Sequence, residues 1–399
     1  MISFNFSNTT KILFGSGKLN NFLLKEVKKS SSSRVFLATD PGLVEAGLIE
    51  SVTNLIEDHG LKVHVYSDVK ANPSSDSIMK GASVFKENNC DLLLAIGGGS
   101  PIDFAKAVGV VASHQDHVLN YVHGGDPIEQ KLPFMICVPT TAGTGSEVTS
   151  VAVVTDEQQE RKMVLASPLI GPDVAIVDPI LTASLPRHMV AATGMDAFVH
   201  ALESYTSINA NPFTDSLALQ SMKMLKEHLP ASYAHSFNHE SKEQVHIAST
   251  MAGVAFNAAG LGLVHACSHP MTALYKVPHG LANAIILPKV IDYNLIANKS
   301  KYADIARILK PELISCDDDS AASFLVEALE EFNKQLDIPR DFSYIEGVMP
   351  GDIDKLVHDA LHDQLTIPLN PRKVNSHDVK QIYQKLLPQL NTDSVAYSN

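Results

Sequence analysis

The residues of this chain that could carry chemistry gather in its second half, where histidines recur at helical spacing. Asp196 and His200 are four residues apart in an apolar stretch, so on a helix both lie on one face. His265 and His269 repeat this spacing, and His279 follows just before another apolar segment. Each piece alone is more often structural, but burying several polar side chains in apolar surroundings is costly unless they have partners. One carboxylate with two or three imidazoles is a donor set for a divalent cation, and we predict such a site here.

Two neighbouring residues are expected to play other parts. Glu203 lies one turn beyond His200, where a partner for a ligand or a salt bridge is the simpler role. Cys267 would point away from a face that holds His265 and His269, so we expect no thiolate ligand. The four cysteines are scattered along the chain, which fits reduced thiols better than a disulfide framework.

A second group of candidate residues is the turn Gly97-Gly-Gly-Ser-Pro101, which follows an apolar run and opens a predicted helix. The glycines would let a phosphate approach the backbone, and the helix N-terminus would offer free N–H groups. Ser100 is the expected N-cap and Pro101 the first helical residue. The spacing matches neither the G-x-G-x-x-G fingerprint nor Walker A, so taken alone a turn that binds nothing is an equal alternative.

A second loop, Pro139 to Glu147, supplies hydroxyl groups and glycines after the next strand. In open parallel sheets ligands bind beyond the carboxyl ends of the strands, so two such loops strengthen the nucleotide interpretation. Asp40 also ends a predicted strand, where a carboxylate could bind an adenosine ribose and would repel a 2′-phosphate. A turn residue before Pro41-Gly42 is the plainer reading of Asp40. Asn72 and Lys162 give weaker signals.

The elements that would position these residues differ between the two halves of the chain. Up to residue 185, apolar runs alternate with helical stretches; they lie at 34–39, 61–66, 91–96, 134–138 and 173–177, with a hairpin over 151–155 and 162–166. This alternation predicts βαβ units and a mostly parallel sheet. Later segments are long and amphipathic, which predicts helices over 189–205, 212–227, 240–261, 281–294 and 321–336. We expect an α/β nucleotide-binding domain over residues 1–185 and an all-helical metal-binding domain over residues 186–399.

Length and charge limit the classes of function. The chain has 399 residues and a net charge of −13, with 17 histidines. This length favours two domains, and an acidic chain without a basic stripe is not expected to bind nucleic acid or an anionic membrane. We see neither a leader pattern nor an apolar run near 20 residues, so we expect a cytoplasmic protein. Residues 2–6 alternate like an edge strand that could pair with a second subunit.

Six motifs, in this order, resemble those of the iron-containing, or group III, alcohol dehydrogenases, most closely the branch of lactaldehyde reductase, 1,3-propanediol dehydrogenase and butanol dehydrogenase. They are Phe14-Gly-Ser-Gly17, Gly97-Gly-Gly-Ser-Pro-Ile-Asp103, Pro139-Thr-Thr-Ala-Gly-Thr-Gly-Ser-Glu147, Gly194-Met-Asp-Ala-Phe-Val-His200, Gly262-Leu-Val-His-Ala-Cys-Ser-His269 and Pro278-His-Gly280.

The resemblance implies that the domain over residues 1–185 binds NAD(P) and that the domain over 186–399 binds metal and substrate. It also implies a role for each candidate residue. The metal ligands would be Asp196, His200, His265 and His279, with His269 as a catalytic residue near the nicotinamide. The residues implied to contact the cofactor are Asp40, Asn72, Gly98, Gly99, Ser100, Thr140, Thr141, Thr144, Val153 and Lys162. The residues implied to line the substrate pocket are Val151 and Phe256. Asp40 matches the acid that favours NAD over NADP in this family. The family name favours Fe²⁺, although a set of three nitrogens and one oxygen also binds Zn²⁺ or Ni²⁺.

The function expected on this basis is reversible hydride transfer between a small primary alcohol or diol, or its aldehyde, and NAD(H). The metal would act as a Lewis acid, and His269 is the candidate proton relay. A dehydroquinate synthase-like lyase is one alternative, disfavoured because residues 194–280 hold only four lysines and no arginine to bind an anionic substrate. A non-catalytic nucleotide-binding protein is another. The resemblance also implies a homodimer or a larger homo-oligomer.

Overall fold

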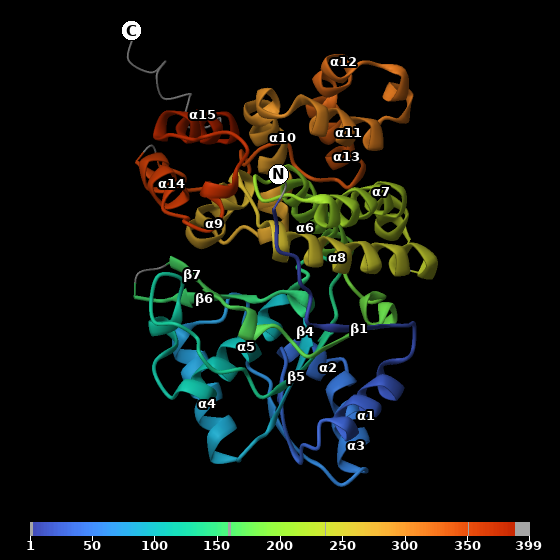
Figure 1. The fold of residues 1–399 in the computed structure, drawn as a ribbon, viewed down its shortest axis with the longest axis vertical. Coiled ribbons are helices and arrows are strands. Elements are labelled where there is room, and N and C mark those ends of the chain that lie inside the picture. The colour runs from blue at the N-terminus through green and yellow to red at the C-terminus, as the bar shows by residue number, and fades with distance from the viewer. Residues whose placement is uncertain (1–2, 159–160, 236, 350, 388–399) are drawn as a thin grey trace. The chain divides into compact units, whose positions relative to one another are not determined.

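The computed structural model describes residues 3–158, 161–235, 237–349 and 351–387. It divides the chain into two compact units (Figure 1). One unit is Ser7–Ser184, and the other comprises Met1–Phe6 and Leu185–Asn399.

The first unit is built on a six-stranded sheet in which all paired strands are parallel, with the order β1-β8-β5-β4-β2-β3. The strands are β1 (Lys11–Phe14), β2 (Arg34–Ala38), β3 (Lys62–Tyr66), β4 (Leu92–Gly97), β5 (Phe134–Pro139) and β8 (Val174–Val177). The predicted α/β fold with a parallel sheet is confirmed. β1 was not predicted; it is a four-residue strand at the sheet edge with no buried residue.

Helices cover both faces of this sheet because β4, at its centre, is apolar on both faces. Leu92, Leu94 and Ile96 belong to a core cluster with α1 (Leu19–Lys29) and α3 (Leu48–Glu57). Leu93 and Ala95 belong to the other core, with α4 (Ser75–Glu87) and α5 (Gly99–His114). The predicted hairpin is present as β6 (Val151–Asp156) and β7 (Arg161–Ala166), an antiparallel pair separate from the main sheet.

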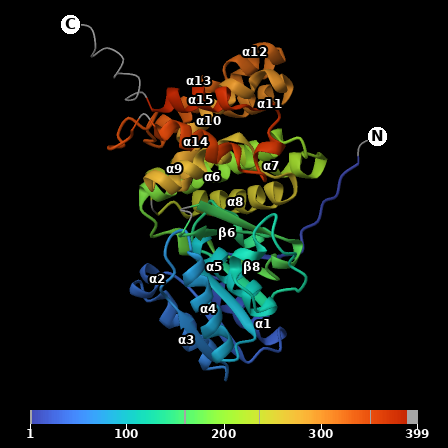
Figure 2. The ribbon, with the colours of Figure 1, turned by 90° about the vertical axis from the view of Figure 1, so that its left-hand side faces the viewer.

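Among its described residues the second unit contains helices and no strand, as predicted. Its α-helices are α6 (Arg187–Thr206), α7 (Pro212–Ala234), α8 (His239–Ala259), α9 (Leu263–Tyr275), α10 (His279–Asn294), α11 (Lys299–Leu309), α12 (Asp318–Ser323), α13 (Leu325–Gln335), α14 (Asp352–Leu361) and α15 (Ser376–Leu386). α6, α7 and α8 lie side by side (Figure 2). The helix expected over residues 321–336 is instead divided at Phe324 between α12 and α13.

The N-terminal segment differs from the sequence-based expectation. Among its described residues, 3–6 form no strand, whereas an edge strand was expected there. Phe6 stacks on Phe213 of α7 with 5.3 Å between ring centroids, and Phe4 lies 5.8 Å from the same ring. These aromatic contacts group the segment with the helical unit, although the expected domain 1–185 places it with the α/β unit.

Among the described helices none is by itself long and apolar enough to cross a membrane. α8 and α9 reach that length and composition only together, as a pair bent by 106°.

Candidate metal and cofactor sites

Four of the predicted site residues converge inside the helical unit. Asp196 and His200 come from α6, His265 from α9, and His279 is the first residue of α10. The Nε2 atoms of the three histidines lie 3.8, 3.9 and 3.8 Å from Oδ1 of Asp196, respectively. Donors at about 2.1 Å from a tetrahedral cation stand roughly 3.4 Å apart, close to these spacings. Asp196, His265 and His279 each offer a ligand atom within 4.8 Å of the other two, so these three could hold one cation. His200 lies outside that group and approaches it through Asp196, so its part as a fourth ligand remains a prediction.

Gly280 allows α10 to approach α6 closely enough for this arrangement. A Cβ atom at Gly280 would lie 2.2 Å from the carbonyl oxygen of Ala192 and 3.0 Å from Cβ of Asp196. Only a residue without a side chain allows the backbone of α10 to approach α6 so closely. Because His279 precedes Gly280 directly, this approach brings its imidazole to Asp196.

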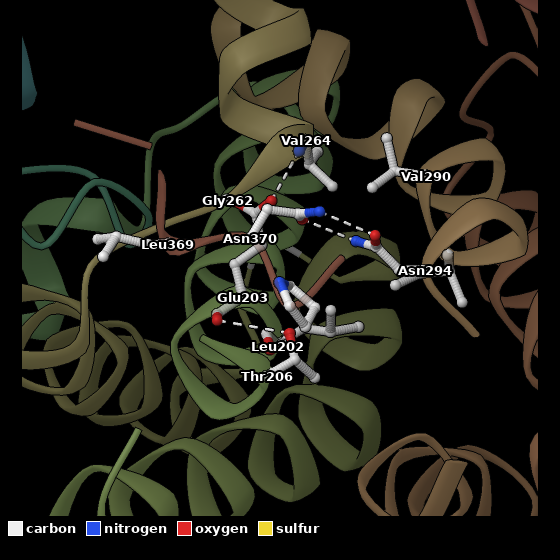
Figure 3. Close-up of a pocket in the computed structure, with 11 residues that line it drawn as sticks. Leu202, Glu203, Thr206, Gly262, Val264, Val290, Asn294, Leu369 and Asn370 are labelled. Atoms are coloured by element: carbon white, nitrogen blue, oxygen red, sulfur yellow. Dashed lines mark hydrogen bonds between the residues drawn. The ribbon is translucent and has the colours of Figure 1, made fainter. Parts of the chain in front are cut away.

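Glu203, one turn after His200, orients a histidine of the cluster. Its carboxylate accepts a hydrogen bond from Nδ1 of His265 at 2.6 Å. It accepts another from the backbone N–H of Val264 at 2.7 Å (Figure 3). Donation from Nδ1 leaves the Nε2 lone pair of His265 facing Asp196. Burial raises the pKa of Glu203 to about 7, although hydrogen bonds from the backbone of Gly262 and Val264 act to lower it. Glu203 thus has the partner role that its spacing suggests.

A buried amide pair supports the start of α9. Asn294 and Asn370 exchange two side-chain hydrogen bonds of 2.8 and 2.9 Å, drawn as paired dashed lines in Figure 3. Oδ1 of Asn370 also accepts from the backbone N–H of Leu263 at 3.3 Å. A Cβ atom at Gly262 would lie 3.2 Å from this Oδ1 and 3.0 Å from Oε1 of Glu203, so the turn into α9 is tightly packed.

His269 stands beside the cluster. Its ring stacks on His279 with 5.4 Å between centroids, and its Nδ1 lies 2.9 Å from Oδ2 of Asp363. Burial raises the pKa of Asp363, but the hydrogen bond and charge of His269, with hydrogen bonds from Thr366, outweigh it and hold the pKa at about 2. An ionised Asp363 therefore orients the His269 ring. Sequence reasoning missed Asp363 because it lies 94 residues further along the chain.

Phe256, predicted to wall the substrate pocket, packs against a residue of the cluster. Its ring stacks on the ring of His200 with centroids 4.4 Å apart. Contact with substrate by Phe256 remains a prediction.

Asn283, on α10, was not predicted, although it is four residues after His279 and so on the same helix face. Its Nδ2 atom contacts Asp196, His265 and His279 at 2.7 to 3.2 Å.

The glycine turn after β4 forms a cradle in the α/β unit. Gly97 has φ +153°, and a Cβ atom there would lie 2.4 Å from Pro101, so the turn requires glycine. α5 begins at Gly99 with Gly98 as N-cap, which corrects the expectation that Ser100 is the cap. The side chain of Ser100 instead accepts a hydrogen bond from the backbone N–H of Asn72 at 3.3 Å.

The hydroxyl loop after β5 lies against this cradle. Cβ atoms at Gly98 and Gly99 would approach side-chain atoms of Thr141 and Thr144 to 3.2 and 2.9 Å. Oγ1 of Thr141 is buried, and it has no hydrogen-bond partner among the described residues. A helix N-terminus without a side-chain cap, an orphaned hydroxyl and bare glycines together suit a phosphate group.

A buried lysine holds the loop and the hairpin to α5. Nζ of Lys106 donates to the carbonyl oxygens of Ser146, Thr149 and Val151 at 2.7, 2.8 and 2.8 Å. Asp103, on the same helix, accepts from Oγ of Ser146 and from the backbone N–H of Val153. Predicted residues Val151 and Val153 are thereby fixed through their backbones. Lys106 and Asp103 were not predicted, although a charged pair three residues apart in an apolar helix was a usable signal.

Of the remaining predicted cofactor residues, Asp40 and Thr140 lie at the ends of strands of the main sheet, and Lys162 lies on the separate hairpin. Asp40 follows β2, the neighbour of β4, and caps α2 (Pro41–Glu45) by accepting from the N–H of Leu43 at 3.2 Å. The N–H of Thr140 donates to the carbonyl of Gly97 at 2.9 Å. Lys162, on β7, pairs with Thr155 of β6. The contact of these residues with a cofactor remains a prediction.

Comparisons with known proteins give consistent matches over both units. Residues 9–179 match the family model described as iron-containing alcohol dehydrogenase, and residues 190–387 match the C-terminal model of the Fe-containing alcohol dehydrogenase family.

Individual relatives cover nearly the whole chain. An NAD-dependent methanol dehydrogenase of Bacillus methanolicus is 39% identical, over 90% of this chain and 94% of its own length. A 1,3-propanediol dehydrogenase of Klebsiella pneumoniae is 36% identical, over 88% of this chain and 91% of its own. A solved 1,3-propanediol oxidoreductase superposes with a TM-score of 0.92 at 34% identity, covering 97% of this chain and all of that one.

Proposed function

Because the chain belongs to the iron-containing alcohol dehydrogenase family and is an oxidoreductase acting on CH–OH groups, we propose that it interconverts small primary alcohols or diols with their aldehydes, using NAD(H). The observation that carries this proposal is the convergence of three histidine Nε2 atoms on one oxygen of Asp196.

The proposed metal ligands are Asp196, His200, His265 and His279. A divalent cation bound there supplies a Lewis acid, and bound NAD supplies the hydride acceptor. With three neutral imidazoles and one carboxylate around it, such a cation keeps one net positive charge, which favours a substrate oxygen that loses its proton. Glu203 contributes by holding His265 in the tautomer that presents Nε2 to the site.

His269 is the proposed proton relay. Oxidation of an alcohol releases a proton that must reach solvent, and His269 is partly exposed beside the cluster, with 22% of its side chain accessible. Asp363 fixes Nδ1 of its ring, so Nε2 remains available to take the proton.

The proposed cofactor residues are the turn Gly98 to Ser100, the loop residues Thr140, Thr141 and Thr144, and Asn72, Val153, Lys162 and Asp40. Asp40 favours NAD because its carboxylate would repel the 2′-phosphate of NADP, and the methanol dehydrogenase relative is itself NAD-dependent. Fe²⁺ is the proposed metal by family membership, with Zn²⁺ or Ni²⁺ as ions that the donor set also suits. Val151 and Phe256 are the proposed substrate-pocket residues. We further propose a cytoplasmic homodimer or larger homo-oligomer.

The test combines elemental analysis with an alcohol panel. Purified protein should contain about one equivalent of a divalent metal and reduce NAD in the presence of ethanol, propanol or 1,3-propanediol. A chelator should abolish this activity, and the metal should restore it. Metal-free protein with full NADH formation would refute the metal-dependent mechanism. Metal-loaded protein inactive with every alcohol and aldehyde would refute the proposed substrates.

A further inference from the structure

Asn283 occupies the centre of the metal-ligand cluster. Its side chain is fully buried, one turn after His279 on α10. Nδ2 donates to Oδ1 of Asp196 at 2.7 Å, and it lies 3.1 Å from Nε2 of His265 and 3.2 Å from Nε2 of His279, so its two N–H bonds are shared among three neighbouring atoms. One amide nitrogen therefore faces three of the four atoms proposed to bind the cation.

The carboxamide has a defined orientation in this cluster. Its Oδ1 is buried and has no hydrogen-bond partner among the described residues, while its nitrogen faces only acceptors. The reverse orientation would bring two partly negative oxygens, Oδ1 of Asn283 and Oδ1 of Asp196, within hydrogen-bond distance without a proton between them. The positive end of the amide dipole thus partly balances the buried carboxylate of Asp196 and engages the histidine lone pairs.

A cation would compete for the same lone pairs. An imidazole Nε2 has one lone pair, which can accept an N–H or bind a metal but cannot fully do both. A cation held at about 2.1 Å by these donors would also face the positive end of the amide dipole at roughly 3 Å. The present orientation of Asn283 therefore suits the cluster without a cation and opposes the cluster with one.

We propose that Asn283 is a positioning residue that stands in for the cation. Its amide holds the donor atoms assembled in the metal-free chain, and it gives up these hydrogen bonds when the cation enters. This inference rests on the proposed metal site. It assigns Asn283 a part in metal affinity that is separate from packing and from metal ligation.

The test compares Asn283→Leu with a matched control, Asn333→Leu. Asn333, on α13, is also a buried amide whose Oδ1 has no partner among the described residues, and its Nδ2 donates at 2.7 Å to the backbone of Ala284 on the same α10. Asn333 therefore reproduces the burial and the helix contact of Asn283 without a bond to a ligand. Full-length proteins would be stripped of metal and reloaded with Zn²⁺. Thermal midpoints of both forms and the Zn²⁺ dissociation constant, from competition with a chelating dye, would then be measured.

Asn283→Leu should lower the midpoint of the metal-free protein by about 3 °C and leave that of the Zn²⁺-loaded protein unchanged. Its Zn²⁺ dissociation constant should fall about tenfold, because the cation no longer has to displace a hydrogen bond to a charged group. The free energy of one such bond corresponds to a factor of about ten. Asn333→Leu should lower both midpoints equally and leave the dissociation constant unchanged. Asn283→Asp, which sets a carboxylate against Asp196, should lower the metal-free midpoint further and bind Zn²⁺ more tightly still.

Three results would overturn the inference. If Asn283→Leu lowered the thermal midpoints of the metal-free and Zn²⁺-loaded proteins equally, as the control should, Asn283 would contribute only packing. If Asn283→Leu lowered the midpoint of the Zn²⁺-loaded protein more than that of the metal-free protein and raised the Zn²⁺ dissociation constant, Asn283 would be a metal ligand. Failure of the wild-type protein to take up Zn²⁺, Co²⁺ or Fe²⁺ would instead refute the metal site itself, and the inference with it.

Discussion

Gly280→Ala should move two of the proposed metal ligands apart without replacing either of them. The new Cβ atom would stand 2.2 Å from the carbonyl oxygen of Ala192, whereas ordinary contact requires at least 3.4 Å. The contact is with backbone, so no side chain can turn aside to relieve it. The N-terminus of α10 must therefore move away from α6 by about 1 Å, and His279 moves with it.

The size of the effect follows from the spacing in the cluster. Nε2 of His279 is 3.8 Å from Oδ1 of Asp196, already slightly more than the roughly 3.4 Å between donors on one tetrahedral cation. A further separation of about 1 Å would take His279 out of reach of the proposed shared ion. We expect metal affinity to fall by at least about tenfold and turnover by about a hundredfold, the loss that a misplacement of this size can produce. Overpacking should also reduce the free energy of unfolding by about 1 to 3 kcal/mol.

The assay is metal binding by chelator competition, with NADH formation measured at saturating metal. Gly351→Ala is a suitable control, because a Cβ atom at Gly351 meets nothing within 4 Å and the residue has an ordinary φ of −69°. The control should keep wild-type affinity and turnover. If Gly280→Ala did the same, the close approach of α10 to α6 would not be what positions His279.

Four further outcomes are expected. Glu203→Gln should weaken metal binding by about 10- to 100-fold in chelator competition, and unchanged binding would contradict its orienting role. His269→Ala should lower turnover by about 10² to 10⁴ with metal content unchanged, and Asp363→Asn by less; full turnover of His269→Ala at every pH would exclude the relay. Asp40→Ser, which retains a capping hydroxyl but removes the charge, should raise kcat/KM for NADP relative to NAD by about tenfold, and an unchanged ratio would exclude Asp40 as the discriminator. Burial lowers the pKa of His246 from 6.5 to about 4, so the unfolded chain binds the extra proton, and stability should fall by up to about 3 kcal/mol between pH 6.5 and 4; urea unfolding of His246→Leu should lack this component.

The sheet could be predicted from sequence because its strands carry strong local signals. Continuous apolar runs such as Leu92 to Ile96 end at glycine or proline, and each stands between helical stretches. β1 lacked such a signal, because a short edge strand is fixed by pairing with β8 rather than by its own residues. The division of the helix at Phe324 likewise has no marker in the sequence.

The proposed metal ligands could be predicted from the sequence for a different reason. Spacings of four residues place polar side chains on one helix face, and this periodicity is visible in the sequence for Asp196 with His200. The partners of His269 and Lys106 depend on contacts with distant segments, which spacing cannot reveal. The cap of α5 was misplaced because the turn at Gly97 fixes where the helix begins, and this tertiary requirement overrides the preference for serine.

The anchoring of residues 146–151 by Lys106 bears on how quickly the proposed cofactor would associate. Three backbone carbonyls between Ser146 and Val151 are already engaged by a buried ammonium group, so this segment gains its order when the α/β unit folds. If the dinucleotide binds there as proposed, little conformational entropy of this segment remains to be lost, and capture should follow a single-step time course without a slower ordering phase. In such a site a change in NAD affinity would come from the rate of escape, with the rate of entry nearly constant.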